Sequence, residues 1–183
     1  MQHIDRDLIE RFRNGDDAAF DQLYEKMHLR IFRFGLRLTA CREDAEDLTV
    51  QTFAEAHRAR RGFQGKSSLE TWFYRIALHQ AHRIRRKKRQ EGRLHDNLVD
   101  RHGDRGFQRI ELEQLIDTLP DRARTSFVLV RCEGLSYREA AEAMGKPIGT
   151  VQSDVHKASR LLRSGFAFDD PVKDTTEDYG YEV

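Results

Sequence analysis

Apolar residues recur at intervals of three and four along most of the chain, the spacing that places them on one face of an α-helix. Similar stripes predict helices over about 5–14, 43–59 and 67–90. Apolar–polar alternation, the pattern of a half-buried β-strand, is almost absent. The fullest stripe starts after Asp16 or Asp17 and joins Phe20, Leu23, Tyr24, Met27, Ile31, Phe34 and Leu38.

The periodicity stops at residues 91–108, which contain three glycines, and resumes at residue 109. Helices are expected there over 109–118, 121–132, 136–144 and 149–164. The pattern predicts an all-α fold of two small helical domains, 1–90 and 109–164. A flexible linker at 91–108 joins them, and a tail at 165–183 follows.

The predicted helix ends carry recognisable signals. Gly15 and Gly134 stop helices, and Gly62 and Gly65 interrupt the chain before the helix over 67–90. Two segments, SSLE at 67–70 and SYRE at 136–139, have the spacing of a capping box, in which a hydroxyl and a carboxylate satisfy free backbone amides.

Composition narrows the class of protein. Of 183 residues 34% are charged, and the mean hydropathy is −0.76. No apolar run approaches the ~20 residues that span a bilayer, and the N-terminus lacks a hydrophobic signal segment, so we expect a cytoplasmic protein without membrane insertion. The cysteines, Cys41 and Cys132, are far apart in sequence, which argues against a disulfide framework or a Cys-based zinc site.

The formal net charge of +1 hides an uneven distribution. Residues 1–90 carry 19 basic and 13 acidic side chains, whereas residues 165–183 carry one and six. The segments between them are balanced. This asymmetry is typical of a polyanion-binding front followed by an acidic tail.

A helix over 136–144, a turn at Gly145 and a helix over 149–164 form a helix-turn-helix pattern. A plain helical hairpin with a solvated polar face is the alternative. On the second helix we expect four residues to pack inward: Val151, Val155, Ala158 and Leu162. The opposite face carries side chains that can reach base edges and phosphates: Gln152, Ser153, His156, Lys157, Arg160 and Arg163.

Basic and aromatic residues occur together in the helix over 67–90. Six cations fall within residues 83–89, and Trp72, Phe73 and Tyr74 precede them. A cationic helix end binds a phosphate backbone, and aromatic rings beside it can stack on unpaired bases. The alternative is a solvated helix end with core aromatics; we favour core for Phe73 and Ile76.

Four carboxylates are clustered at Glu43, Asp44, Glu46 and Asp47. They can bind a cation, favour the N-terminal end of their own helix, or contact a basic partner. No histidine lies at metal-ligand spacing to them. Nucleophile motifs, Walker loops and dinucleotide loops are absent as well, so we expect no catalytic residue, metal or cofactor.

Three segments in this order resemble a bacterial RNA polymerase sigma factor of the extracytoplasmic-function (ECF) group. They are DAEDLTVQTFAEAHRA, RGFQGKSSLETWFYRIALHQAHRIRRKKR and LPDRARTSFVLVRCEGLSYREAAEAMGKPIGTVQSDVHKASRLLR, and the resemblance covers about residues 5–165. It implies a non-enzymatic protein that binds core RNA polymerase. Such a protein recognises and melts specific promoters and initiates transcription of a stress- or signal-responsive regulon.

The resemblance also implies a role for each region. The polymerase partners are the β′ clamp helices and the β subunit, and the β′ contacts would come from Asp44, Asp47, Leu48, Gln51, Thr52 and Glu55. The next loop and helix would melt the minus-ten element and hold flipped bases of the non-template strand, which costs a few kcal/mol of unstacking. The candidates are Phe63, Gln64, Lys66, Ser67, Ser68, Trp72, Tyr74, Arg75, His79, Gln80, Arg83 and Arg86.

The C-terminal domain would read the double-stranded minus-thirty-five element, and the linker would run toward the RNA exit path. The reading positions match Gln152, Ser153, His156 and Lys157. Phosphate contacts are implied for Arg131, Arg138, Thr150 and Arg160.

The sequence departs from the family pattern DAEDLxQExF, because Val50 and Gln51 replace the Gln and Glu. Thr49 and Thr52 are candidates for phosphorylation by a Ser/Thr kinase, which would restore negative charge; otherwise they are ordinary helix-surface residues. An anti-sigma factor is the other type of regulator. Basic residues are also missing from the second helix of the helix-turn-helix, where Gln152, Asp154 and Ser159 stand, so we expect the C-terminal domain alone to bind DNA weakly.

The tail has low hydrophobicity and an acidic excess, which predicts disorder. Alternatively, it folds back on the basic N-terminal domain as a DNA mimic, using Phe166, Phe168, Tyr179 and Tyr181.

Overall fold

The computed structural model describes residues 4–90 and 111–165, and over these residues it contains helices and no strand. This confirms the predicted all-α fold. The predicted linker with its expected path, and the predicted tail with its two alternatives, lie outside the described residues. Within the described part of the chain, no helix is both long and apolar enough to cross a bilayer.

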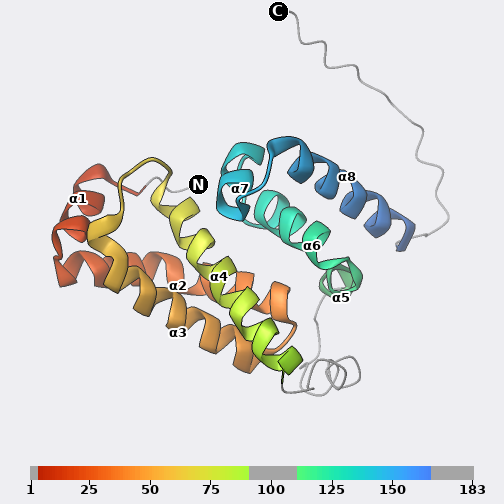
Figure 1. Ribbon diagram of the computed structural model, residues 1–183, viewed down its shortest axis with the longest axis horizontal. Coiled ribbons are helices and arrows are strands. Elements are labelled where there is room, and N and C mark those ends of the chain that lie inside the picture. The colour runs from red at the N-terminus through yellow and green to blue at the C-terminus, as the bar shows by residue number, and fades with distance from the viewer. Residues whose placement is uncertain (1–3, 91–110, 166–183) are drawn as a thin grey trace, which may run out of the picture.

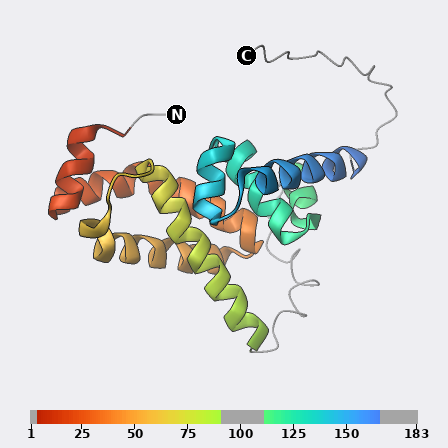
Figure 2. The same ribbon diagram turned by 45° about the horizontal axis from the view of Figure 1, so that its top comes forward.

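The first part contains α1 (Arg6–Asn14), α2 (Asp17–Thr39), α3 (Arg42–Ala59), the 3₁₀ turn η1 (Arg60–Gly62) and α4 (Leu69–Gln90). The second contains α5 (Glu111–Thr118), α6 (Asp121–Phe127), the π-helical segment η4 (Val128–Cys132), α7 (Tyr137–Met144) and α8 (Ile148–Gly165). Figures 1 and 2 show α4 lying between α2 and α3 on one side and α7 on the other.

Side-chain caps explain where several helices begin. Asp16 precedes α2 and accepts hydrogen bonds from the backbone amides of Ala18 and Ala19, at 2.9 and 3.3 Å. Ser136 and Glu139 form the predicted capping box at α7. The other predicted box, Ser67 with Glu70, is wrong. Ser68 accepts from the Thr71 amide at 3.1 Å, whereas Glu70 is buried, so α4 begins one residue later than that box requires.

The N-terminal core forms where α2, α3 and α4 meet. The predicted stripe on α2 supplies Leu23, Met27, Ile31 and Phe34, each at most 1% exposed. Burying one such side chain stabilises the fold by about 1.5–3 kcal/mol. α4 contributes Phe73, which is fully buried against Phe12 and Phe53.

The C-terminal core forms between α6, η4, α7 and α8. The inward-facing stripe predicted for the last helix is confirmed, because Val151, Val155, Ala158 and Leu162 are all buried. The helix predicted over 121–132 is α-helical only to Phe127, and the Glu133 amide then donates to the Val128 carbonyl over a wider π-helical turn at 3.0 Å.

The two cores are continuous in this structure. Buried residues of α1–α4 and of α5–α8 belong to one hydrophobic cluster, and α4 packs against α7 while α2 packs against α5 and α6. Arg124 of α6 crosses this boundary, where its buried guanidinium donates to the Leu38 carbonyl at 3.4 Å. The same guanidinium donates to the Leu119 carbonyl at 3.1 Å.

Candidate nucleic-acid and protein interfaces

The outer face of α8 presents the side chains expected to contact DNA. Gln152, Ser153, His156 and Lys157 are exposed, and Arg160 continues the same face one turn later. α7 packs against α8, and the two helices form the predicted helix-turn-helix around Gly145. Gly145 has a φ of 61°, the left-handed conformation that glycine adopts readily. Arg131 and Arg138 are exposed beside this pair, and Thr150 is half-buried.

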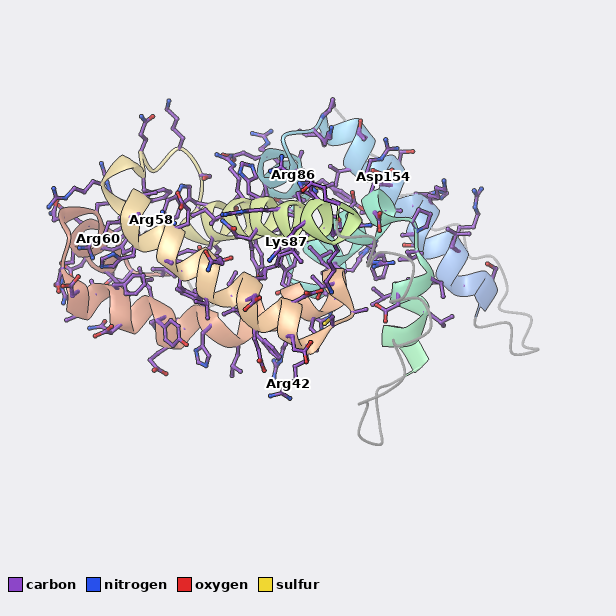
Figure 3. All side chains as sticks on the ribbon, turned by 60° about the horizontal axis from the view of Figure 1, so that its bottom comes forward. Arg42, Arg58, Arg60, Arg86, Lys87 and Asp154 are labelled. Atoms are coloured by element: carbon purple, nitrogen blue, oxygen red, sulfur yellow. The ribbon has the colours of Figure 1, made fainter. Side chains whose placement is uncertain are left out.

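Asp154 does not belong to that outer face. It is 3% exposed, and its carboxylate lies 2.8 Å from Nε of Arg122 on α6. Figure 3 labels Asp154 on α8 at the side that meets α6. Asp154 therefore supplies neither a basic nor a free acidic group to the outer face, and the expected weak DNA binding of the C-terminal domain alone stays a prediction.

α3 presents an outward face of mixed acidic and apolar character. Six residues on this face are exposed, at intervals of one and three along α3: Glu43, Glu46, Asp47, Val50, Gln51 and Ala54. Val50 is 64% exposed, the largest value among the exposed large hydrophobic residues of the described chain. Arg42 pairs with Glu46 at 2.8 Å at one end of this face, and Arg58 pairs with Glu55 at 2.6 Å at the other (Figure 3).

Three residues expected to contact polymerase from α3, and the phosphorylation candidate Thr49, are buried or half-buried instead. Leu48 and Thr52 are fully buried, so the expectation that they contact a partner is wrong for this structure. The Thr49 and Thr52 hydroxyls donate to the carbonyls of Ala45 and Leu48, both at 2.7 Å, so neither is presented for modification. Asp44 is half-buried, and its carboxylate pairs with Nζ of Lys88 of α4 at 2.5 Å.

The minus-ten candidates in the loop before α4 lie partly on the surface and partly in the core. Gln64 and Lys66 are exposed, and Ser67 and Ser68 are half-buried. Phe63 is 3% exposed and packs on Trp72, with ring centroids 5.3 Å apart, so it is not available to a base. Trp72 itself is half-buried and also contacts Phe12.

Tyr74 forms a buried hydrogen bond with Glu133, which directly follows η4. Its ring is fully buried, and its hydroxyl donates to Oε2 of Glu133 at 2.6 Å. Burial, followed by the Glu133 charge, raises the pKa of Tyr74, so the hydroxyl stays protonated and remains a donor. In this arrangement no base can reach the ring, so the expected contact of Tyr74 with a base stays a prediction and requires a different placement of Glu133.

The remaining candidates on α4 are at least partly accessible, and His79 and Arg86 border a cavity shared with α6 and α7. His79, Arg83 and Arg86 are exposed, and Gln80 is half-buried. Arg75 pairs with Glu142 of α7 at 3.0 Å, and Arg85 pairs with Asp121 of α6. Figure 3 labels Arg86 and Lys87 on this helix.

Sequence reasoning missed the residues that join the two halves. Glu133 accepts from Tyr74 and also from Nη1 of Arg37 at 3.0 Å, and its side chain is 5% exposed. Arg30 donates weakly to the Glu133 carbonyl at 3.5 Å. No local signal marks these residues, since the partners are separated by 59 to 103 positions in the sequence.

Burial changes the titration of one histidine on α4. The pKa of His82 is lowered by burial and then by nearby His79, so His82 is neutral at pH 7. Among residues 4–90 and 111–165, no group of three His, Cys, Asp or Glu side chains is arranged to hold a metal ion.

Comparisons with known proteins match both halves of the chain. The family described as Sigma-70 region 2 matches residues 23–91, and the family described as Sigma-70, region 4 matches residues 109–162. Among curated proteins, the chain is similar to the RNA polymerase sigma-H factor of Pseudomonas aeruginosa, with 33% identity over 88% of this chain and 93% of that protein. It is also similar to the ECF RNA polymerase sigma-E factor of Haemophilus influenzae, with 30% identity over 89% and 95%.

Solved structures support the same fold. The sigma factor RpoE of Bartonella quintana, in complex with the anti-sigma factor NepR, aligns with a TM-score of 0.72 at 24% identity, covering 82% of this chain and 98% of that one. CnrH in complex with the cytosolic domain of CnrY aligns with a TM-score of 0.69 at 23% identity, covering 91% and 99%. At this identity the likeness concerns the fold.

Proposed function

Because the chain belongs to the sigma-70 family of RNA polymerase sigma factors, within the ECF group, we propose how its residues divide the work of initiation. A sigma factor directs core RNA polymerase to promoters, and this chain does so for a stress- or signal-responsive regulon. Its partners are core RNA polymerase and promoter DNA. The observation that carries the residue assignment is the outward face of α8, which is polar and cationic while its opposite face is buried.

The minus-thirty-five element is read by α8. Gln152, Ser153, His156 and Lys157 are exposed on one face, and such side chains hydrogen-bond to base edges in the major groove. Arg131, Arg138 and Arg160 lie around them and contact phosphates, which set the register of the protein on DNA without selecting sequence. In this assignment, residues 109–164 form the minus-thirty-five domain.

Core polymerase docks on the outer face of α3, in the domain formed by residues 1–90. Asp47 and Gln51 keep the role expected for them, and Glu43, Val50 and Ala54 join them because they share the same exposed face. An exposed valine surrounded by carboxylates supports a protein contact, since interfaces combine an apolar centre with a polar rim.

The minus-ten element is contacted first by exposed residues of the loop and of α4: Gln64, Lys66, His79, Arg83 and Arg86. Tyr74 and Arg75 take part only after the two domains separate, because Glu133 and Glu142 hold them in this structure. Promoter melting therefore requires a more open arrangement than this one.

The chain contributes no catalytic group of its own in this proposal and acts in the cytoplasm with the polymerase. An anti-sigma factor is the regulator that the relatives support, since the named sigma factor of Bartonella quintana was solved with one. Phosphorylation of Thr49 or Thr52 is not supported, because both hydroxyls are bonded inside the helix.

Run-off transcription with purified core enzyme tests the proposal. We expect the chain to support a specific transcript from a promoter selected from genomic fragments. Gln152→Ala with Lys157→Ala should lower the yield at that promoter by about tenfold or more, since each lost base contact costs about 1–3 kcal/mol. DNA binding without a transcript would instead indicate a free-standing helix-turn-helix regulator, and polymerase binding without a transcript would indicate a sequestering protein.

A further inference from the structure

A groove lies between α4 on one side and α6 and α7 on the other. Its volume is about 800 Å³, and its apolar floor includes Leu38, Leu78, Ala81 and Met144. The rim carries the cations Arg85, Arg86, Arg122 and Lys146, together with His79 and the neutral His82. The groove therefore combines an apolar floor with a positively charged edge.

Carboxylates neutralise only part of this edge. Asp121 already pairs with Arg85, and Glu142 pairs with Arg75. Arg122 pairs with Asp154 inside the C-terminal half. Arg86 and Lys146 are exposed, and neither has a carboxylate partner within residues 4–90 and 111–165. The site can therefore accept a further anion.

The occupant that matches both properties is an acidic segment with aromatic side chains. Residues 166–183 carry six carboxylates and one lysine, together with Phe166, Phe168, Tyr179 and Tyr181. Residues 91–110 carry equal numbers of acidic and basic side chains, so they lack the complementary charge. A bare phosphate would leave the apolar floor uncovered.

The segment is long enough to reach the groove. α8 begins at Ile148, two residues after Lys146, and its 18 residues span about 27 Å. The 18 residues that follow Gly165 can extend over roughly 60 Å, so they can return along α8 to the groove.

We propose that the acidic segment 166–183 binds in the groove between α4 and α6–α7 and thereby holds the two domains together. It would cover Arg86 and His79, so the free protein would keep this part of its DNA surface closed until polymerase separates the domains. This consequence for DNA, though not the docking itself, rests on the function proposed above.

Photo-crosslinking in the full-length chain tests the docking without polymerase or DNA. Benzoylphenylalanine replaces Tyr179, and mass spectrometry locates the crosslinks. We expect them on residues 78–86 and 142–146, at a yield that does not change on dilution. Arg86→Glu with Lys146→Glu should lower that yield by about tenfold, as two favourable ion contacts become repulsive. Arg13→Glu with Arg33→Glu makes the same charge change at exposed sites elsewhere and should leave it unchanged.

Crosslinks scattered over the surface, formed only between molecules, or equal in the two double variants would overturn the proposal. A second measurement links docking to DNA. Neutralising the six acidic residues of the segment should strengthen binding of the free chain to promoter DNA several-fold at low salt, and the gain should shrink in the Lys146→Glu background because the two changes act at one site. An undiminished gain there would count against docking.

Run-off transcription in parallel separates the two claims. Specific transcripts without the expected crosslinks would overturn the docking and leave the sigma-factor assignment standing. Crosslinks at the groove without any transcript would overturn the proposed function and leave the docking standing.

Discussion

At the scale of single residues, Gly35 sets the distance between α2 and α3. A Cβ added there would lie 3.2 Å from Cδ2 of Leu48 and 3.3 Å from the backbone Cα of Ala45. Gly35→Ala should therefore push the two helices apart and lower the free energy of unfolding by about 1–3 kcal/mol. The loss should appear in urea unfolding followed by circular dichroism, although alanine is the better helix former.

Gly149→Ala is the matched control for this substitution. Gly149 lies in α8, and an added Cβ would meet no atom within 4 Å. Its free energy of unfolding should stay constant or rise by up to about 1 kcal/mol, because alanine loses less backbone entropy than glycine. If Gly35→Ala behaved like Gly149→Ala, close packing between α2 and α3 would not be the reason for the glycine.

At the scale of elements, the outer face of α3 makes a prediction about polymerase affinity. Asp47→Arg should weaken binding to core enzyme by about tenfold or more, because a repulsive charge replaces a contact on the docking face. Gln51→Glu should act in the opposite direction, strengthening binding about two- to fivefold by supplying the carboxylate that the family pattern has there. Fluorescence anisotropy of labelled protein titrated with core enzyme measures both changes.

Asp21→Arg on α2 is the control for charge, since Asp21 is also exposed but lies on another helix. Equal losses for Asp47→Arg and Asp21→Arg would mean that polymerase responds to overall charge and that α3 has no special role. Unfolding curves of all three variants should coincide with that of the unmodified chain, because these side chains bury little surface.

Helix positions were predictable from sequence because their signals are local. The stripe on α2, the stop at Gly15 and the capping box at Ser136 each depend on residues within one or two helical turns. The phase of α3 was misjudged for Leu48 and Thr52, although the 3.6-residue period through Ala45 and Phe53 would have placed them inside. The π-helical turn after Phe127 has no such local signal.

At the scale of the whole molecule, the contact between the two domains was not predictable. A tyrosine can stack on a base and a glutamate is usually exposed, yet Tyr74 and Glu133 are both buried. The Tyr74 hydroxyl donates to the Glu133 carboxylate, so each satisfies the other's polar group. Periodicity cannot report a contact between residues 59 positions apart. The sequence therefore predicts DNA contacts for α4 and α8, but it does not predict the arrangement that closes one domain against the other.

The Glu133 contacts predict how this closed arrangement opens. Glu133→Gln removes the charge that Arg37 and the Tyr74 hydroxyl share in a buried site, and breaking a buried pair costs about 3–5 kcal/mol. Both domains keep their own cores, so the cost should fall on the interface and appear as a larger radius of gyration in small-angle X-ray scattering.

Glu142→Gln is the control, because it removes the same charge from a more exposed pair. The side chains of Glu142 and Arg75 are 36% and 38% accessible, so this change should alter the radius of gyration little. Equal expansion in both variants would mean that net charge closes the domains; expansion in Glu133→Gln alone would identify one buried carboxylate as the residue on which closure depends.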